Sequence, residues 1–292
     1  MQRKTLLTVL FYIFCFYSCI SGTGKDTRKV LASADPKDSL ALRGTVPFEY
    51  DNFKKGILLD AIVNDTLHVK AFFDTGSIGV AMSGEFSKNG SKKDIPTPFK
   101  LQIGRWIYKQ PTTIYINNKF LFDFHGCNVL CGGVFFMDRI IEISFEHHYI
   151  RELENTEGLG SYDKIPFKSQ NRCHPVIKAK VCIKGKTIEG EFLMDTGYNG
   201  TITVSSSLVN KYKILTKDDF EFEAVGITKN TKNVRSSADT IQVGRNYITN
   251  TIAFLETENN RAIGLIGNKF FDHFSVVLDF KNNYLYLKPI DK

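Results

Sequence analysis

Hydrophobic and polar residues alternate along much of this chain, in runs that have the length of β-strands. Residues 67–73, Leu-His-Val-Lys-Ala-Phe-Phe, alternate with a period of two, which is typical of a half-buried strand. Residues 56–63 and 176–183 are similar runs, and each is followed by a polar or glycine-containing turn. Apolar residues at helical spacing occur in residues 267–274, and residues 276–280 and 284–287 around a polar turn predict a hairpin that closes the second half of the chain. The pattern predicts an all-β protein with a few short helices.

One stretch of this pattern occurs twice. Residues 71–79 read Ala-Phe-Phe-Asp-Thr-Gly-Ser-Ile-Gly, and residues 192–200 read Phe-Leu-Met-Asp-Thr-Gly-Tyr-Asn-Gly. Further matches follow in the same order, namely residues 103–108 with 243–248, 130–136 with 265–271, and 141–149 with 276–284. A repeat of this length indicates duplication within the chain. Because its period exceeds that of solenoid repeats, it predicts two lobes.

Each copy places an acid directly after an apolar strand, with glycine two residues later. A carboxylate at the end of a buried strand is costly unless something pairs with it, and glycine permits a sharp turn or a close approach. If the two turns face each other, Asp74 and Asp195 become neighbours. Two adjacent carboxylates do not both ionise easily, so they share a proton. One then serves as a base that activates water and the other as an acid.

These motifs resemble the active site of the aspartic proteases, the pepsin and retropepsin group. In that family, Asp-Thr/Ser-Gly from each of two lobes supplies one catalytic carboxylate, and an apolar-apolar-Gly step follows each motif. Gly132 and Gly267 end such steps here. The resemblance implies a two-lobed pepsin/retropepsin-like fold and an aspartic-type endopeptidase with catalytic Asp74 and Asp195. The residues that it implies as support for the active site are Thr75, Gly76, Ser77, Thr196 and Gly197.

The two copies differ in ways that bear on mechanism. Ser77 matches a serine that helps keep the adjacent acid ionised in the family, whereas its counterpart is Tyr198. The resemblance therefore implies Asp74 as the base and Asp195 as the acid, although a coupled pair titrates as a unit. Residues 220–243 add two strand-like runs around a polar turn, which predicts a hairpin. We expect this hairpin to be a flap over the substrate; the alternative is an ordinary surface insertion.

The first residues have the features of an export signal. Arg3 and Lys4 precede an apolar run over residues 6–17, which is short for a membrane span and typical of a secretory signal. The run ends in Ser-Cys, so Cys19 is predicted to be the lipidated residue of a bacterial lipoprotein; ordinary secretion with later cleavage is the alternative. The sequence thus predicts an envelope protein anchored to a membrane by lipid, with the side of the membrane left open.

The predicted organisation has five parts: a signal peptide (1–19), a polar tether (20–45), an N-terminal lobe with Asp74 (46–153), a linker (154–170) and a C-terminal lobe with Asp195 (171–292). We expect the protein to act as a monomer. The polar composition of the tether is typical of a solvated segment.

Cofactor and nucleic-acid classes find no support in the composition. The formal net charge is +7, but no basic stripe with interleaved aromatic residues indicates a nucleic-acid interface. No Cys-x-x-Cys or paired histidine spacing indicates zinc, so neither metal nor cofactor is expected, and His68 is predicted to be a surface residue. The pairing of Cys127, Cys131, Cys173 and Cys182 cannot be read from spacing. Cys131 and Cys182 lie in apolar runs and are expected to be buried thiols.

The expected partners are a protein or peptide substrate and the membrane. The alternative from another functional class is a non-catalytic envelope lipoprotein that binds a peptide or glycan on the same fold. Retention of both acids favours the protease, and Tyr198 favours the binding protein. Cleavage of a substrate other than protein is the third possibility.

Overall fold

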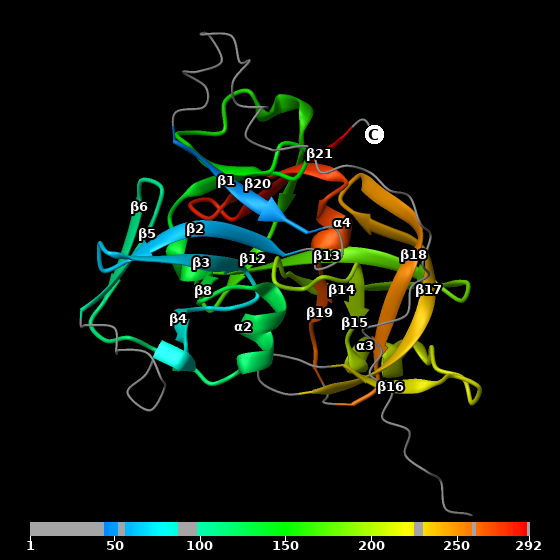
Figure 1. The fold of residues 1–292 in the computed structure, drawn as a ribbon. Coiled ribbons are helices and arrows are strands. Elements are labelled where there is room, and N and C mark those ends of the chain that lie inside the picture. The colour runs from blue at the N-terminus through cyan, green and yellow to red at the C-terminus, as the bar shows by residue number, and fades with distance from the viewer. Residues whose placement is uncertain (1–43, 52–55, 87–97, 225–229, 259–260, 291–292) are drawn as a thin grey trace, which may run out of the picture. The chain divides into compact units, whose positions relative to one another are not determined.

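The computed structural model describes residues 44–51, 56–86, 98–224, 230–258 and 261–290 (Figure 1). Strands dominate this part of the chain, which confirms the all-β prediction. The helices are all short. They are η2 (Gly84–Phe86), α2 (Lys119–His125), η3 (Gly133–Phe135), η4 (Leu159–Ser161), α3 (Ser206–Tyr212) and α4 (Asn268–Phe271). The predicted signal peptide with Cys19 and most of the predicted tether lie outside the described residues.

The first sheet is built mainly from the first half of the chain. In the described residues it has 13 strands, in the order β11-β21-β20-β9-β10-β1-β2-β3-β8-β4-β7, with β5 paired to β2 and β6 paired to β5. Its strands are β1 (Thr45–Tyr50), β2 (Ile57–Val63), β3 (Leu67–Asp74), β4 (Val80–Ser83), β5 (Phe99–Ile103), β6 (Trp106–Gln110), β7 (Tyr115–Ile116), β8 (Val129–Gly132), β9 (Ile140–Ser144), β10 (Tyr149–Leu153), β11 (Asp163–Pro166), β20 (Phe274–Asp279) and β21 (Tyr284–Pro289).

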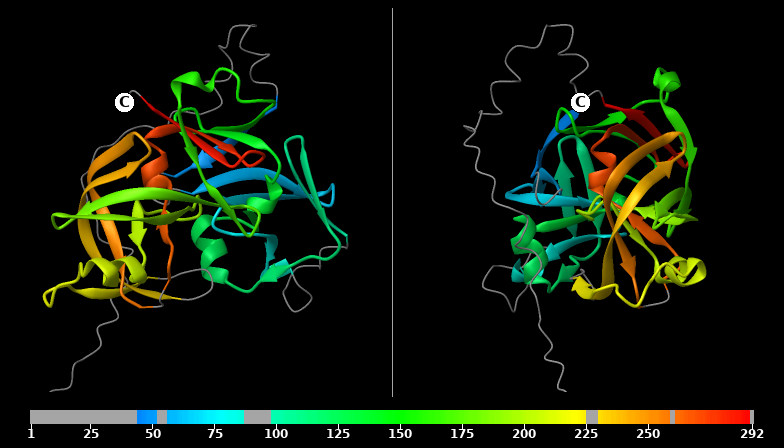
Figure 2. Two further views of the ribbon diagram at one scale, coloured as in Figure 1. Left: turned by 180° about the vertical axis from the view of Figure 1, so that it is seen from behind. Right: turned by 90° about the vertical axis from the view of Figure 1, so that its right-hand side faces the viewer.

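The second sheet comes from the second half. Its eight strands, counted over the same described ranges, run in the order β12-β13-β14-β19-β15-β18-β17-β16, and β13 also pairs with β17. They are β12 (Lys168–Gln170), β13 (His174–Ile183), β14 (Lys186–Met194), β15 (Ile202–Val204), β16 (Glu221–Ala224), β17 (Thr231–Val243), β18 (Asn246–Glu256) and β19 (Gly264–Ile266). Figure 2 shows the long β17 and β18 of this sheet, in orange, from two further sides.

The two copies of the repeat occupy matching places in the two sheets. β3 and β14, which lead into the Asp-Thr-Gly motifs, each pair in parallel with a later strand of the same half, β8 and β19 respectively. In the first sheet Asp74 lies opposite Gly132. In the second sheet Met194 lies opposite Ile266, and these two residues directly precede Asp195 and Gly267. Parallel strands with both faces covered tolerate continuous apolar runs. This explains why the repeat is most apolar directly before each acid.

The last hairpin differs from the prediction. The sequence predicts a hairpin over residues 276–287 that closes the second half, and β20 and β21 do form a hairpin. However, β20 pairs with β9 and β21 pairs with β11, so the hairpin belongs to the first sheet, where Figure 1 shows it in red. In this position between β9 and β21, consecutive residues Val276, Val277 and Leu278 are all buried, so both faces of β20 are covered.

Two further segments refine the predicted boundaries. The segment predicted as a linker, residues 154–170, contains β11 and β12, which pair with β21 and β13. The predicted second-half hairpin is present as β16 paired with β17, while its turn at residues 225–229 lies outside the described residues. The structure therefore describes the hairpin strands, and the flap role stays a prediction.

Candidate active site

The two acids leave their strands at the same point of the repeat. Asp74 is the last residue of β3, and Asp195 follows Met194, the last residue of β14. Phe73 and Met194 directly before them are fully buried, and the Asp74 residue itself is 2% exposed. Apolar strands thus carry both acids to the ends of buried runs, and the loops that follow bring the two acids together.

The threonines of the two motifs bind each other's loops below the acids. The Thr75 backbone N–H donates to Thr196 Oγ1 at 2.9 Å, and the Thr196 N–H donates to Thr75 Oγ1 at 3.0 Å. Each hydroxyl also donates across the interface, Thr75 to the Met194 carbonyl at 2.6 Å and Thr196 to the Phe73 carbonyl at 3.0 Å. Both threonines are completely buried. This reciprocal set of four hydrogen bonds fixes one loop against the other.

The glycines allow the carboxylates to approach. A Cβ atom on Gly76 would lie 2.5 Å from the Asp195 carboxyl carbon, and a Cβ atom on Gly197 would lie 2.5 Å from the Asp74 carboxyl carbon. No side chain can be accommodated at such distances without displacing the acid. The backbone of each glycine is therefore in direct contact with the carboxylate of the opposite loop.

The donors to the two carboxylates are unequal. Asp74 accepts hydrogen bonds from the Gly76 N–H at 2.8 Å and from the Ser77 hydroxyl at 2.7 Å. Asp195 accepts a hydrogen bond from the Gly197 N–H at 2.9 Å, and the Tyr198 N–H also interacts with its carboxylate, so its donors are backbone groups. Tyr198, the counterpart of Ser77, turns away: its hydroxyl accepts from the Thr203 hydroxyl at 3.0 Å. A side-chain hydroxyl thus serves only one side of the pair among these contacts.

This environment favours the protonated form of Asp195. Burial raises the pKa of Asp195 well above its usual value, and the charge of Asp74 together with a hydrogen bond to Asp74 raises it further. The backbone N–H groups of Gly197 and Tyr198 oppose this effect. A carboxylic acid that keeps its proton beside a carboxylate can donate a hydrogen bond to a reacting oxygen.

The glycines at the ends of β8 and β19 support the loops from behind. The Gly132 N–H donates to the Gly79 carbonyl at 2.9 Å, and a Cβ there would lie 2.4 Å from that same oxygen. In the second half, the Gly267 N–H donates to the Thr201 carbonyl at 3.1 Å, and a Cβ would lie 2.3 Å from the Tyr198 carbonyl. Both strand ends therefore pass so close to the loops that only glycine fits.

One supporting residue is missed by reasoning from the sequence. The Asn268 side-chain amide donates to the Thr196 carbonyl at 2.6 Å, and Asn268 is fully buried. The sequence holds one sign of this residue: the two copies of the repeat differ here, because Asn268 follows Gly267 where Gly133 follows Gly132.

The cysteines are free thiols in the described structure. Cys127, Cys131 and Cys173 are buried, which confirms the expectation for Cys131. The expectation for Cys182 is wrong, because this residue is partly exposed and its thiol lies 3.5 Å from Asp239 Oδ2. It alternates with Val181 and Ile183, which face the core, so it points to the other side of β13.

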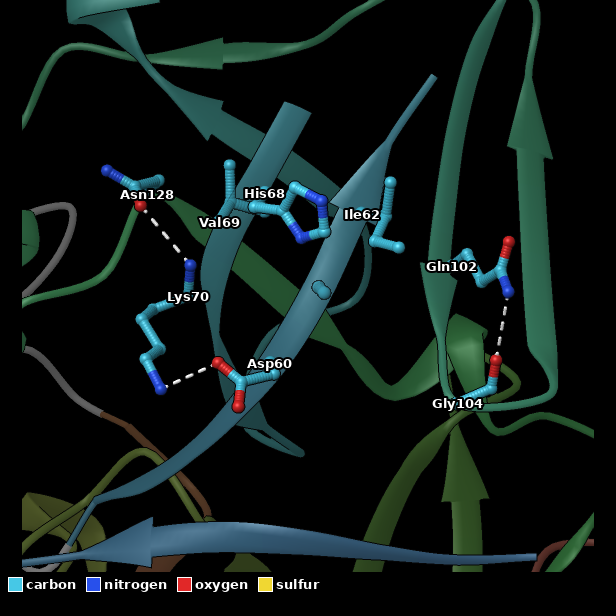
Figure 3. Close-up of a pocket in the computed structure, with 9 residues that line it drawn as sticks. Asp60, Ile62, His68, Val69, Lys70, Gln102, Gly104 and Asn128 are labelled. Atoms are coloured by element: carbon cyan, nitrogen blue, oxygen red, sulfur yellow. Dashed lines mark hydrogen bonds and ion pairs between the residues drawn. The ribbon is translucent and has the colours of Figure 1, made fainter. Parts of the chain in front are cut away.

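One described hollow lies away from the two acids. It has a volume of about 420 Å³ and is lined by strands β2, β3 and β5, and the exposed His68 contributes to its wall (Figure 3). There the Lys70 ammonium lies 2.7 Å from the Asp60 carboxylate, and the Lys70 backbone N–H donates to the Asn128 side-chain oxygen at 3.2 Å. Neither Asp74 nor Asp195 lines this hollow, so we assign it no part in the chemistry.

No cluster of three or more histidine, cysteine, aspartate or glutamate side chains suited to a metal ion occurs among the residues that the structure describes. Among its described helices, none is long and apolar enough to cross a membrane. In comparisons with known proteins, neither a family model nor a curated protein matched this chain.

Proposed function

We propose that this protein is an aspartic endopeptidase with a two-lobed pepsin/retropepsin-like fold, in which Asp74 and Asp195 activate one water molecule. The observation that carries the proposal is the reciprocal arrangement at the two motifs. Each Asp-Thr-Gly loop holds the other through threonine hydroxyls, and each glycine lies under the opposite carboxylate. Two independent structural turns would have no reason to be built against each other in this way.

The unequal environments support a division of roles. Asp74, whose carboxylate accepts from the Ser77 hydroxyl as well as from a backbone N–H, acts as the base that removes a proton from water as the water attacks the scissile carbonyl carbon. Asp195, whose pKa is raised by burial and by Asp74, holds the proton that is donated toward the carbonyl oxygen and is then passed on to the leaving nitrogen. The products are a carboxylic acid and an amine, and the dyad returns to one shared proton.

The test is cleavage of a random peptide library by the full chain from about pH 3 to about pH 8. Asp74→Asn and Asp195→Asn proteins are compared with the parent. Asp60→Asn is the matched control, because Asp60 is an exposed residue of β2 that pairs with Lys70 and not with the dyad. We expect the parent and the control to cleave and both dyad variants to lose activity by about 1,000-fold or more. A folded parent that is inert at every pH would contradict the proposal and favour a peptide- or glycan-binding protein.

The membrane attachment is part of the same proposal. A lipid on Cys19 with the polar segment that follows would hold the enzyme at a membrane of the bacterial envelope. Replacing Cys19 by alanine is expected to move the protein from the membrane fraction to the soluble fraction. A protein that stays in the membrane fraction after Cys19→Ala would contradict the anchor.

A further inference from the structure

The loops that follow the two acids have the same backbone contacts. The Ser77 carbonyl accepts from the Gly133 N–H at 2.8 Å, and the Tyr198 carbonyl accepts from the Asn268 N–H at 3.0 Å. Ser77 and Tyr198 each stand three residues after the acid, and Gly133 and Asn268 each follow the glycine at the end of the later strand. Because both backbones are held alike at this point, differences between the loops here come from their side chains.

The Tyr198 ring fills the space beside the Asp195 loop. A Cβ atom on Gly200 would lie 2.1 Å from the Tyr198 hydroxyl oxygen and 2.2 Å from the ring carbon Cζ, and a Cβ atom on Gly267 would lie 2.6 Å from the ring carbon Cδ1. The ring therefore lies across these two glycines, and its hydroxyl is held by the Thr203 hydroxyl at 3.0 Å. Tyr198 is partly exposed, whereas Gly200 beneath it is buried, so the ring forms the surface at this position.

The same space is open beside the Asp74 loop. Gly79 is the counterpart of Gly200 in the repeat, and a Cβ atom there would have no neighbour within 4 Å among the described residues, its chain neighbours aside. Ser77 does not fill this space, because its short side chain donates to Asp74 at 2.7 Å. The adjacent Ile78 is 45% exposed. The Asp74 loop thus offers an open position with an exposed apolar side chain beside it.

The exposed Ile78 side chain belongs to a well-fixed backbone. The Ile78 carbonyl accepts from the Val134 N–H at 3.1 Å, and its carbonyl carbon would lie 2.7 Å from a Cβ atom on Gly132. Covering an exposed apolar side chain with an apolar group of a ligand is favourable, and a backbone that is already fixed loses little freedom on binding. The open position beside the Asp74 loop therefore favours a large apolar group.

We propose that Tyr198 is a specificity-determining residue, whose ring closes the substrate subsite over Gly200 while the equivalent subsite over Gly79 is open. A peptide whose scissile bond lies between Asp74 and Asp195 places one residue over each loop, on opposite sides of that bond. The residue over the Asp195 loop must then be small, such as glycine, alanine or serine, and the residue over the Asp74 loop large and apolar. This inference rests on the proposed function, because it names the substrate class of that site.

The first test compares the residues around the bonds that the parent and its Tyr198 variants cleave in a random peptide library. In the parent, one position is expected to accept only small residues, and the position at the same distance on the other side of the bond large apolar ones. Tyr198→Ala should raise kcat/KM for leucine or phenylalanine at the restricted position by about 10-fold or more, because it frees a filled subsite. Tyr198→Leu should give a smaller rise. Tyr198→Phe keeps the ring and is the control, so it should keep the preference of the parent.

The graded series keeps the test informative even where one variant does not fold, which melting temperatures measured beside the profiles would show. An unchanged preference in Tyr198→Ala and Tyr198→Leu would overturn the proposal. Equal relaxation in Tyr198→Phe would also overturn it, because the volume of the ring would then not be the cause. Equal relaxation on both sides of the cleaved bond would do the same.

The second test needs no cleavage, so it separates this inference from the proposed function. A random peptide library displayed on phage is selected for binding to the full chain with Asp74→Asn, and to the full chain with both Asp74→Asn and Tyr198→Ala. Large residues should be enriched at one more position of the bound peptides when Tyr198 is replaced. A selection that changes in this way while the parent is inert would refute the peptidase and support this inference. Identical selections, or the absence of any selected peptide, would overturn it.

Discussion

The loops around Asp74 and Asp195 have the same backbone plan and different chemistry. Both use threonine to bind the opposite loop and glycine to admit the opposite carboxylate. Yet a serine hydroxyl donates to Asp74, while the tyrosine at the same place in the other loop contacts Thr203. The comparison teaches that the repeat preserves what holds the acids together, and that the residue after each Asp-Thr-Gly decides whether the acid accepts from a side-chain hydroxyl.

The largest effect is expected from a methyl group placed under either acid. In Gly76→Ala the new Cβ would meet the Asp195 carboxyl carbon, and in Gly197→Ala it would meet the Asp74 carboxyl carbon, each at 2.5 Å. Because misplacing a reacting group by about 1 Å can cost about 100-fold in rate, both variants should lose at least that much peptidase activity. Gly160→Ala is the control, since a Cβ there has no neighbour within 4 Å among the described residues. Near-normal activity of Gly76→Ala or Gly197→Ala would contradict the view that both loops need glycine to admit the opposite carboxylate.

The second effect concerns the threonines. Thr196→Ala leaves the buried Thr75 N–H without an acceptor and removes the donor to the Phe73 carbonyl. We expect the free energy of unfolding to fall by about 2–4 kcal/mol. Thr75→Ala should behave alike, because its hydroxyl has the mirror-image contacts. Thr196→Ser keeps the hydroxyl and should retain most of the stability in denaturant titrations. A loss confined to one of the two threonines would show that the loops are not equivalent in stability.

The third prediction uses the raised pKa of Asp195. Folded Asp195 keeps its proton above its ordinary value of 3.8, where the unfolded chain has released it, so the folded state is progressively disfavoured as pH rises from there. Asp195→Asn removes this penalty. The variant should melt at a higher temperature than the parent at neutral pH, and the difference should fade as pH falls below about 4. A lower melting temperature at neutral pH would contradict the assignment of the proton to Asp195.

The smallest effect is expected from making the two loops alike. Tyr198→Ser supplies a hydroxyl at the position from which Ser77 donates to Asp74. A donor to the Asp195 carboxylate favours its ionised form and lowers its pKa. Since the mechanism needs protonated Asp195, the alkaline side of the pH–activity profile should move to lower pH by about half a unit. Tyr198→Phe, which lacks only the contact with Thr203, is the control and should leave the alkaline side in place.

Much of the candidate site could be predicted because it follows local rules. An apolar run that ends in Asp-Thr-Gly requires a buried strand, a turn and a close approach, and its recurrence indicates that two such turns meet. The sequence marks Asn268, whose amide donates to the Thr196 carbonyl, only by its difference from Gly133 in the repeat, and it gives no signal for Cys173, whose thiol lies 3.9 Å from the Ile78 carbonyl oxygen. Both contacts join segments distant in the chain, and neither residue type is unusual at its position in the local pattern.

The sequence by itself thus determined the strand content, the internal repeat and the pairing of Asp74 with Asp195, because alternation and repetition are recorded residue by residue. Only the tertiary structure decided which sheet takes the C-terminal hairpin, which face of β13 presents Cys182, and that the Ser77 hydroxyl donates to Asp74 while Tyr198 contacts Thr203. The physical reason is that strand partners and side-chain directions depend on what covers each face of a sheet, and that is a property of the folded chain as a whole.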